Sequence, residues 1–123
     1  MTEELPPGPP DGFPEDVDPP EDGTLGGYLN VHLRSPAFLG SDGYPYTISL
    51  EVEQTGDLMA PYCGYLVFPR WAETGMGILG HLETPVLLHG TSRAQVEQAL
   101  GDLTLERVHD LLEEAIRRQS RKP

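Results

Sequence analysis

Hydrophobic and polar residues alternate most regularly over residues 46–53, Y-T-I-S-L-E-V-E. Side chains of a strand point alternately to its two faces, so a period of two places all the apolar residues of this segment on one face. The segment is therefore predicted to be a strand that buries Tyr46, Ile48, Leu50 and Val52. Residues 28–34, Y-L-N-V-H-L-R, show the same alternation and predict another half-buried strand.

Residues 62–68, Y-C-G-Y-L-V-F, are apolar on both faces, which is typical of a strand in the middle of a sheet. Pro69 is expected to end this strand, because proline has no backbone N–H to donate to a neighbouring strand. Residues 78–84 and 85–89 are predicted to add one or two further strands.

The last third of the chain has a helical pattern. Ser92 and Gln95 have the spacing of a capping box, and Gly101 is expected to end the helix that starts there. Thr104 is predicted to cap a second helix, in which apolar residues recur every three or four positions. The order of elements predicts an α+β fold, with an antiparallel sheet of four to five strands followed by two C-terminal helices packed on one face.

The start of the chain has a different composition. Residues 1–23 contain seven prolines, eight carboxylates and no basic side chain. Proline and repelling charges prevent such a segment from burying enough apolar surface to fold. We therefore expect a disordered, acidic, proline-rich tail over residues 1–24 and a single α+β domain over residues 25–123.

The net charge of −12, of which the first 23 residues hold −8, narrows the choice of partners. An acidic surface repels nucleic acid and anionic membranes, so neither is expected to bind, whereas a basic protein is suited to it. The chain has a single cysteine, no secretory signal at its start and no long apolar run, so we expect a cytoplasmic protein. An unpaired edge strand would permit a homo-oligomer.

Residues 75–80, G-M-G-I-L-G, match the G-x-G-x-x-G pattern of dinucleotide-binding turns. Such a turn needs a following helix, whose N-terminus receives the pyrophosphate, but Pro85 and a strand-like composition follow here. We interpret Gly75 and Gly77 as loop residues and Gly80 as a bulge or a close approach of backbones, and expect no cofactor.

The titratable residues offer little chemistry. His81, Glu83 and His89 would meet only if residues 78–89 form a hairpin with an odd loop, because a single strand separates the two histidines by about 26 Å. No metal is therefore expected. Cys63 lies in the most apolar strand without a cationic neighbour, and we assign no catalytic residue.

A candidate interface lies in residues 68–75, F-P-R-W-A-E-T-G, which we place in a loop after the central strand. Tryptophan and arginine are the residues that most often anchor interfaces, so Arg70, Trp71 and Glu73 are the candidates. The alternative is that Trp71 closes the end of the core while Arg70 pairs with Glu73 or Glu83.

Three segments carry a resemblance: Y-T-I-S-L-E-V-E, G-Y-L-V-F-P and L-L-H-G-T-S-R-A-Q-V-E-Q-A-L. Together they resemble small HicB-type antitoxins, in which strands containing G-Y and a proline precede a polar-Gly-Thr motif at a helix start. The insertion from Arg70 to Leu87 and the two consecutive helices depart from that pattern. The resemblance implies a small acidic regulator that binds another protein.

Our leading hypothesis is a non-enzymatic protein-binding or regulatory module that acts through a sheet face or edge, or through Arg70 and Trp71. The alternative is a small-molecule-binding or enzymatic domain. Its pocket would lie between the sheet and the helices, around Tyr65, His81 and Glu83.

Overall fold

The computed structural model describes residues 23–121. The tail predicted over residues 1–24 therefore lies almost entirely outside the described residues. Its last two residues belong to the fold, because the Gly23 carbonyl accepts a hydrogen bond from the Leu105 N–H at 2.7 Å and Thr24 caps a helix.

Six strands and three helices are formed by the described residues. The strands are β1 (Phe38–Leu39), β2 (Pro45–Tyr46), β3 (Ser49–Gln54), β4 (Tyr62–Trp71), β5 (Ile78–Glu83) and β6 (Leu88–Gly90). The helices are α1 (Leu25–His32), α2 (Arg93–Gly101) and α3 (Leu105–Arg121). The order of these elements confirms the α+β class, with one helix and at least one strand more than the sequence predicted.

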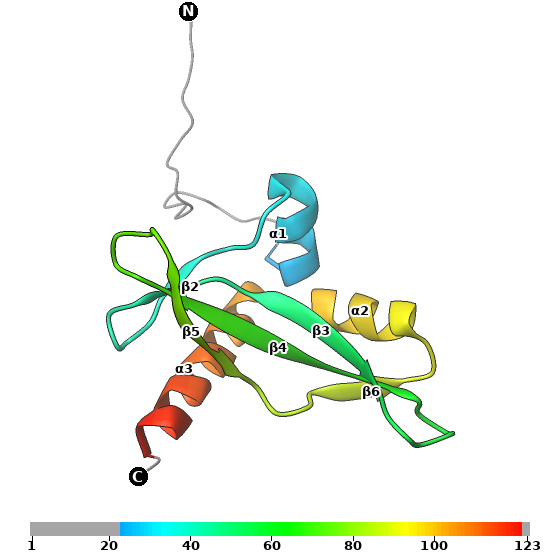
Figure 1. The fold of residues 1–123 in the computed structure, drawn as a ribbon. Coiled ribbons are helices and arrows are strands. Elements are labelled where there is room, and N and C mark those ends of the chain that lie inside the picture. Colours follow the sequence, from blue (N-terminus) through cyan, green and yellow to red (C-terminus); the bar gives the residue numbers. More distant parts are fainter. Residues whose placement is uncertain (1–22, 122–123) are drawn as a thin grey trace, which may run out of the picture.

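β4 is the centre of an antiparallel sheet (Figure 1). One edge of β4 pairs with β3 and, farther along, with β2, which also pairs with β1. The other edge pairs with β5 along one half and with β6 along the other. The prediction that residues 62–68 form the middle strand is confirmed.

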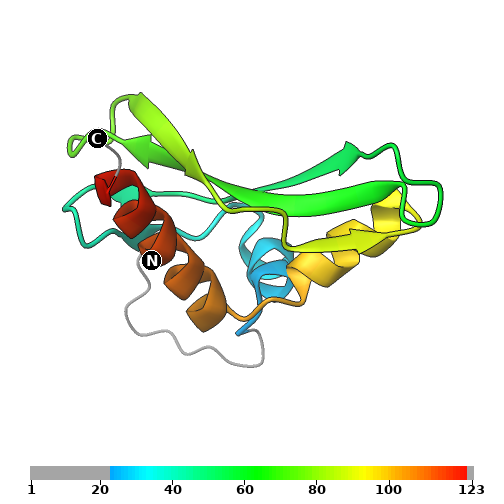
Figure 2. The same ribbon diagram turned by 90° about the horizontal axis from the view of Figure 1, so that it is seen from below.

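The three helices of residues 23–121 lie on the same face of the sheet, as Figure 2 shows. The core fills the space between these two layers. It consists of Leu25, Tyr46, Ile48, Leu66, Phe68, Leu82, Val96, Leu100, Val108, Leu111, Leu112, Ala115 and Ile116. α2 packs tightly against β4 at Gly64, where a Cβ atom would lie only 2.5 Å from a Val96 methyl group.

The two C-terminal helices begin where their caps predict. The Ser92 hydroxyl accepts from the Gln95 N–H at 3.1 Å, and the Gln95 side chain accepts from the Thr91 N–H rather than from the cap residue itself. The Thr104 hydroxyl accepts from the Arg107 N–H at 3.0 Å. These local hydrogen bonds explain why the helix starts could be read from the sequence.

The prediction of a strand over residues 28–34 is wrong, because this segment belongs to α1 and the turn after it. The Thr24 hydroxyl accepts from the Gly27 N–H at 3.0 Å and starts the helix. The helix buries Leu25 and Tyr28, three residues apart, whereas Val31 is 66% exposed. Packing of the helix side that carries Leu25 and Tyr28 therefore overrides the strand preference that the alternation of residues 28–34 indicated.

The prediction that Pro69 ends the central strand is also wrong, because β4 continues to Trp71. Pro69 lies beside the break between β2 and β3, and its carbonyl still accepts from the Thr47 N–H at 3.1 Å. Only the hydrogen bond that a backbone N–H at Pro69 would have donated is missing at this position. The strand predicted over residues 46–53 is accordingly split into β2 and β3, although its apolar side faces the core as expected.

Candidate functional site

The face of the sheet opposite the helices is covered by no helix of the described residues (Figure 2), and we call it the uncovered face. Directly paired residues of neighbouring strands share a face, and residues two apart in one strand do so as well. β4 therefore places a strip of half-buried side chains along the middle of the uncovered face, which we call the central strip: Tyr65, Val67, Pro69 and Trp71.

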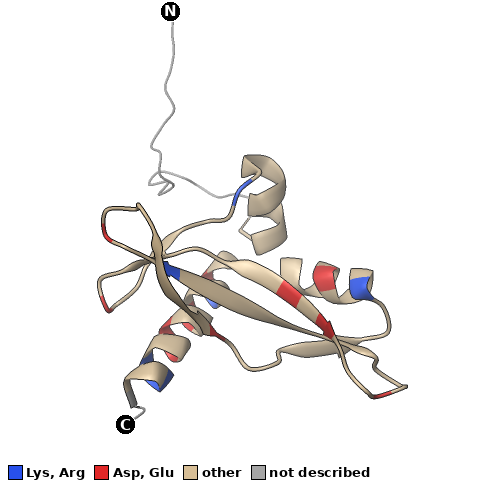
Figure 3. Ribbon diagram, in the orientation of Figure 1, with Lys and Arg blue, Asp and Glu red and all other residues tan. Residues whose placement is uncertain are grey.

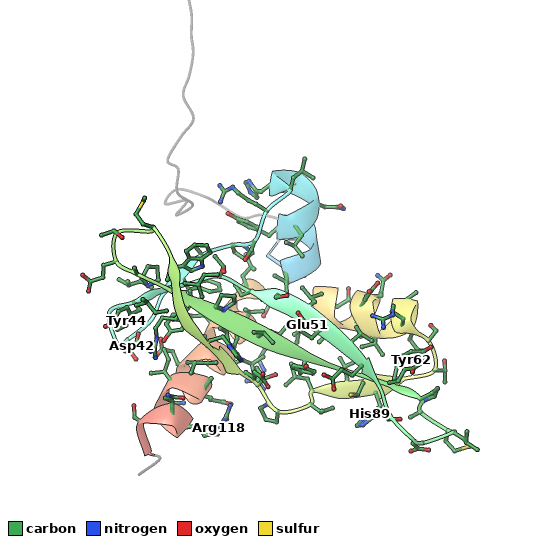
Figure 4. All side chains as sticks on the ribbon, in the orientation of Figure 1. Asp42, Tyr44, Glu51, Tyr62, His89 and Arg118 are labelled. Carbon is green, nitrogen blue, oxygen red and sulfur yellow. The ribbon has the colours of Figure 1, made fainter. Side chains whose placement is uncertain are left out.

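Carboxylates flank the central strip on both sides. Glu51 of β3 lies directly opposite Tyr65, and Glu53 follows two residues later on the same face. Glu83 of β5 lies opposite Val67 on the other side of β4. The acidic positions of β3 are visible in Figure 3, and Glu51 is labelled in Figure 4.

Tyr65 lies in the field of these carboxylates. Its hydroxyl donates to Glu53 Oε2 at 2.7 Å. This hydrogen bond raises the pKa of Tyr65 to about 12, with smaller contributions from desolvation and from the charges of Glu53, Glu83 and Glu51. The Tyr65 ring therefore offers an aromatic surface within a negative potential.

No arginine or lysine occupies a strand position of the uncovered face in the part of the chain that the structure describes. His81 lies on this face opposite Pro69, and its Nε2 is 3.3 Å from Glu83 Oε2. Both side chains are about half exposed, so the pair is open to water. The carboxylates consequently have no permanent cationic partner on the face.

The candidate interface of Arg70, Trp71 and Glu73 is divided by the structure. Arg70 and Trp71 are consecutive in β4 rather than in a loop, so their side chains point to opposite faces. Trp71 lies on the uncovered face, where its indole N–H donates to Thr47 Oγ1 at 3.0 Å. Glu73 is exposed in the turn between β4 and β5. Trp71 alone of the three is part of the central strip.

Arg70 has a structural environment instead. Its Nε donates to the Tyr46 hydroxyl at 2.8 Å, and its guanidinium is 3.4 Å from Asp42. The guanidinium also lies over the Tyr44 ring, 5.1 Å from its centre. Arg70 thus holds the turn between β1 and β2, where Figure 4 labels Asp42 and Tyr44, and pairs with neither Glu73 nor Glu83.

Tyr65, His81 and Glu83 share the uncovered face, whereas the alternative hypothesis placed them between the sheet and the helices. A depression of about 480 Å³ does lie between β5 and α3. Residues 81–85 line it together with Arg118, which donates to the Glu83 carbonyl at 3.3 Å. Tyr65 has no part in its lining, so the three residues do not form one pocket there.

The two histidines that were considered as metal ligands also lie apart. His81 is opposite Pro69 and His89 is opposite Cys63, six residues away along β4. At about 3.3 Å per residue, this corresponds to about 20 Å. Residues 78–90 run beside β4 as one interrupted strand rather than as a hairpin, and no three His, Cys, Asp or Glu residues of the described segment are grouped to hold a metal.

The glycines of residues 75–80 lie in the β4–β5 hairpin and at its bulge. Gly75 has a φ of 78° in the turn, and Gly80 has a φ of 150° opposite Arg70, where the register shifts. A strand, not a helix, follows the motif. The interpretation of these glycines as loop and bulge residues agrees with this geometry.

The sequence interpretation did not single out Glu51 and Glu53 as parts of a site. Their alternation with Leu50 and Val52 predicted only a polar strand face. To recognise both carboxylates as parts of a site, one would have had to pair residues 49–54 with residues 62–67, because this pairing brings them next to Tyr65.

None of the described helices is long and apolar enough to cross a membrane. Neither a protein-family model, nor a curated protein, nor a solved structure matches the chain.

Proposed function

We propose that the protein is a non-enzymatic binding module that holds a basic protein segment on the uncovered face of its sheet. One observation carries this proposal: the half-buried central strip is flanked on both sides by carboxylates that have no arginine or lysine partner on the face. Binding would cover the partner's basic surface, and a regulatory protein of this kind would act by blocking that surface.

Charge complementarity is the physical basis of this recognition. Glu51 and Glu53 on one side and Glu83 on the other create a negative potential over Tyr65, which attracts cationic side chains and raises the rate of encounter. A lysine or arginine placed over the Tyr65 ring would gain a further cation–π contact. The strand ladder holds these groups in place before binding, which lowers the entropy cost of association.

The charge of the whole chain supports the same partner class. The net charge of −12 favours approach of basic proteins and disfavours nucleic acid and anionic membranes. The proposal involves neither a cofactor nor a metal, and it assigns the protein to the cytoplasm. The alternative of a small-molecule or enzymatic site has less support, because Tyr65 lies on the other side of the sheet from the space between the layers.

The experiment is a binding titration with a synthetic oligolysine peptide at low and at physiological salt. A Glu51→Gln/Glu83→Gln variant is compared with a Glu97→Gln/Glu106→Gln variant, which removes the same charge from exposed positions of α2 and α3. We expect the first variant to bind about five- to tenfold more weakly, because it removes two exposed ion pairs, each of which contributes about 0.2–1 kcal/mol.

The control variant should bind nearly as well as the wild type. Equal weakening by both variants would show that only net charge matters and would contradict the proposed site. A peptide of glutamates should not bind at all.

A further inference from the structure

Charged residues are unevenly distributed along the uncovered face, and this distribution specifies the partner more closely. All three carboxylates lie near Tyr65 and Val67. Toward the other end, Pro69 and Trp71 have Thr47, His81 and Ile78 as neighbours. The central strip thus passes from acidic surroundings to largely uncharged ones.

The uncharged end continues onto exposed apolar residues. Ile78, directly opposite Trp71, is 58% exposed, and Met76 in the turn of the same hairpin is 84% exposed. A large exposed apolar side chain paired with a half-buried tryptophan is typical of the apolar anchor of a protein-binding surface. Charge alone therefore does not describe what this face would bind.

The dimensions of the central strip match a short helix. Tyr65 and Trp71 are six residues apart in β4, which corresponds to about 20 Å, the length of a helix of about 13 residues. The strip is one strand wide, so it would accommodate the narrow apolar stripe of an amphipathic helix. Long basic side chains at both margins of that stripe would then reach Glu51 and Glu53 on one side and Glu83 on the other.

We propose that the partner segment is a basic amphipathic helix. Its apolar stripe lies along the central strip and covers Trp71 and Ile78, and its lysine or arginine residues flank the stripe at the Tyr65 end. This inference rests on the proposed function and adds the form and the apolar anchor of the partner. The interface is small, so we expect a dissociation constant of about micromolar order.

Three synthetic peptides of about 14 residues, without tryptophan, distinguish a helical partner from an extended one and from binding by charge alone. The spacing of the apolar residues in each peptide decides whether a helix or a strand presents them on one face. The first carries leucine at helical spacing with lysine on both margins. The second has the same composition with leucine and lysine alternating, as in a strand. The third is a helical peptide of alanine and lysine. Trp71 is the only tryptophan of the chain, so its fluorescence reports contact with the central strip directly.

We expect the first peptide to become helical on binding, to change the Trp71 emission and to bind about tenfold more tightly than either of the others. An Ile78→Ser variant should weaken the first peptide severalfold and leave the alanine–lysine peptide unaffected. A Val31→Ser variant is the matched control, because Val31 is 66% exposed on α1 in the helical layer.

Equal affinity for all three peptides would overturn the helical, apolar-anchored partner and leave the charge-based proposal intact. Tighter binding of the alternating peptide would replace the helix by an extended segment. Failure of every lysine peptide to bind better than a glutamate peptide would overturn the proposed function itself.

Discussion

The break between β5 and β6 leaves one backbone donor of the central strand without a strand partner, and Thr84 fills that gap. The Leu66 N–H donates to Thr84 Oγ1 at 3.1 Å, while the Thr84 N–H donates to the Leu66 carbonyl at 2.9 Å. The Thr84 hydroxyl in turn donates to the Pro85 carbonyl at 2.7 Å. Thr84 is the buried polar residue of the described core, 6% exposed, and Leu66 is fully buried.

Replacing Thr84 with valine keeps the shape of the side chain and removes the acceptor. The Leu66 N–H is then buried without a hydrogen bond, which costs about 1–3 kcal/mol. Pro85 is exposed, so its carbonyl can bond to water instead. We therefore expect Thr84→Val to lower the free energy of unfolding by about 2 kcal/mol.

Urea unfolding followed by circular dichroism measures this loss. With a slope of about 1.5 kcal/mol per molar urea, a loss of about 2 kcal/mol lowers the midpoint by about 1.3 M. Hydrogen exchange of the Leu66 amide should also become faster in the variant, because its acceptor is gone. This second measurement reports the proposed bond itself rather than overall stability.

Thr84→Ser is the control, because it keeps the hydroxyl and removes one methyl group. Its cost should be near the value for burying one carbon, about 0.8 kcal/mol. Wild-type stability of Thr84→Val, or a larger loss in Thr84→Ser than in Thr84→Val, would refute the argument.

Three further predictions follow from other contacts. Gly64→Ala should destabilise the fold by about 1–3 kcal/mol in urea, because its Cβ would meet α2 at 2.5 Å; unchanged stability would mean that α2 is not held against β4 there. Tyr46 and Tyr65 should both ionise near pH 12 rather than 10, Tyr46 chiefly because burial raises its pKa and Tyr65 because of its hydrogen bond to a carboxylate. The raised pKa values mean that the folded state binds both tyrosine protons more tightly than the unfolded state does. The contribution of the two protonated tyrosines to the free energy of unfolding is therefore complete below pH 10 and is lost as the pH rises to about 12. An absorbance titration tests this, and midpoints at 10 would contradict it. Arg70→Met should lower the free energy of unfolding by about 1–2 kcal/mol through loss of its bonds to Tyr46 and Asp42. It should leave peptide binding unchanged, and weaker binding would return Arg70 to the interface.

Elements with local signals could be predicted from the sequence. The caps at Ser92 and Thr104 each bond to a backbone N–H three residues later, so neighbouring residues contain all the information that starts α2 and α3. The alternation of residues 46–53 likewise predicts which side is buried. α1 has a similar cap at Thr24, but the alternation of residues 28–34 indicated a strand, and the burial of Leu25 and Tyr28 that favours a helix depends on elements far along the chain.

The candidate site likewise depends partly on the sequence alone and partly on the tertiary structure. The sequence by itself determined the residue types that matter on the uncovered face: a tyrosine and a tryptophan in an apolar strand, carboxylates at alternate positions of another strand, and an acidic chain overall. Only the tertiary structure decided that Glu51, Tyr65 and Glu83 are neighbours and that Arg70 is not among them. Strand pairing and register bring together residues about 14 to 18 positions apart, and all three helices of the described segment pack on the other face because the larger apolar surface lies there.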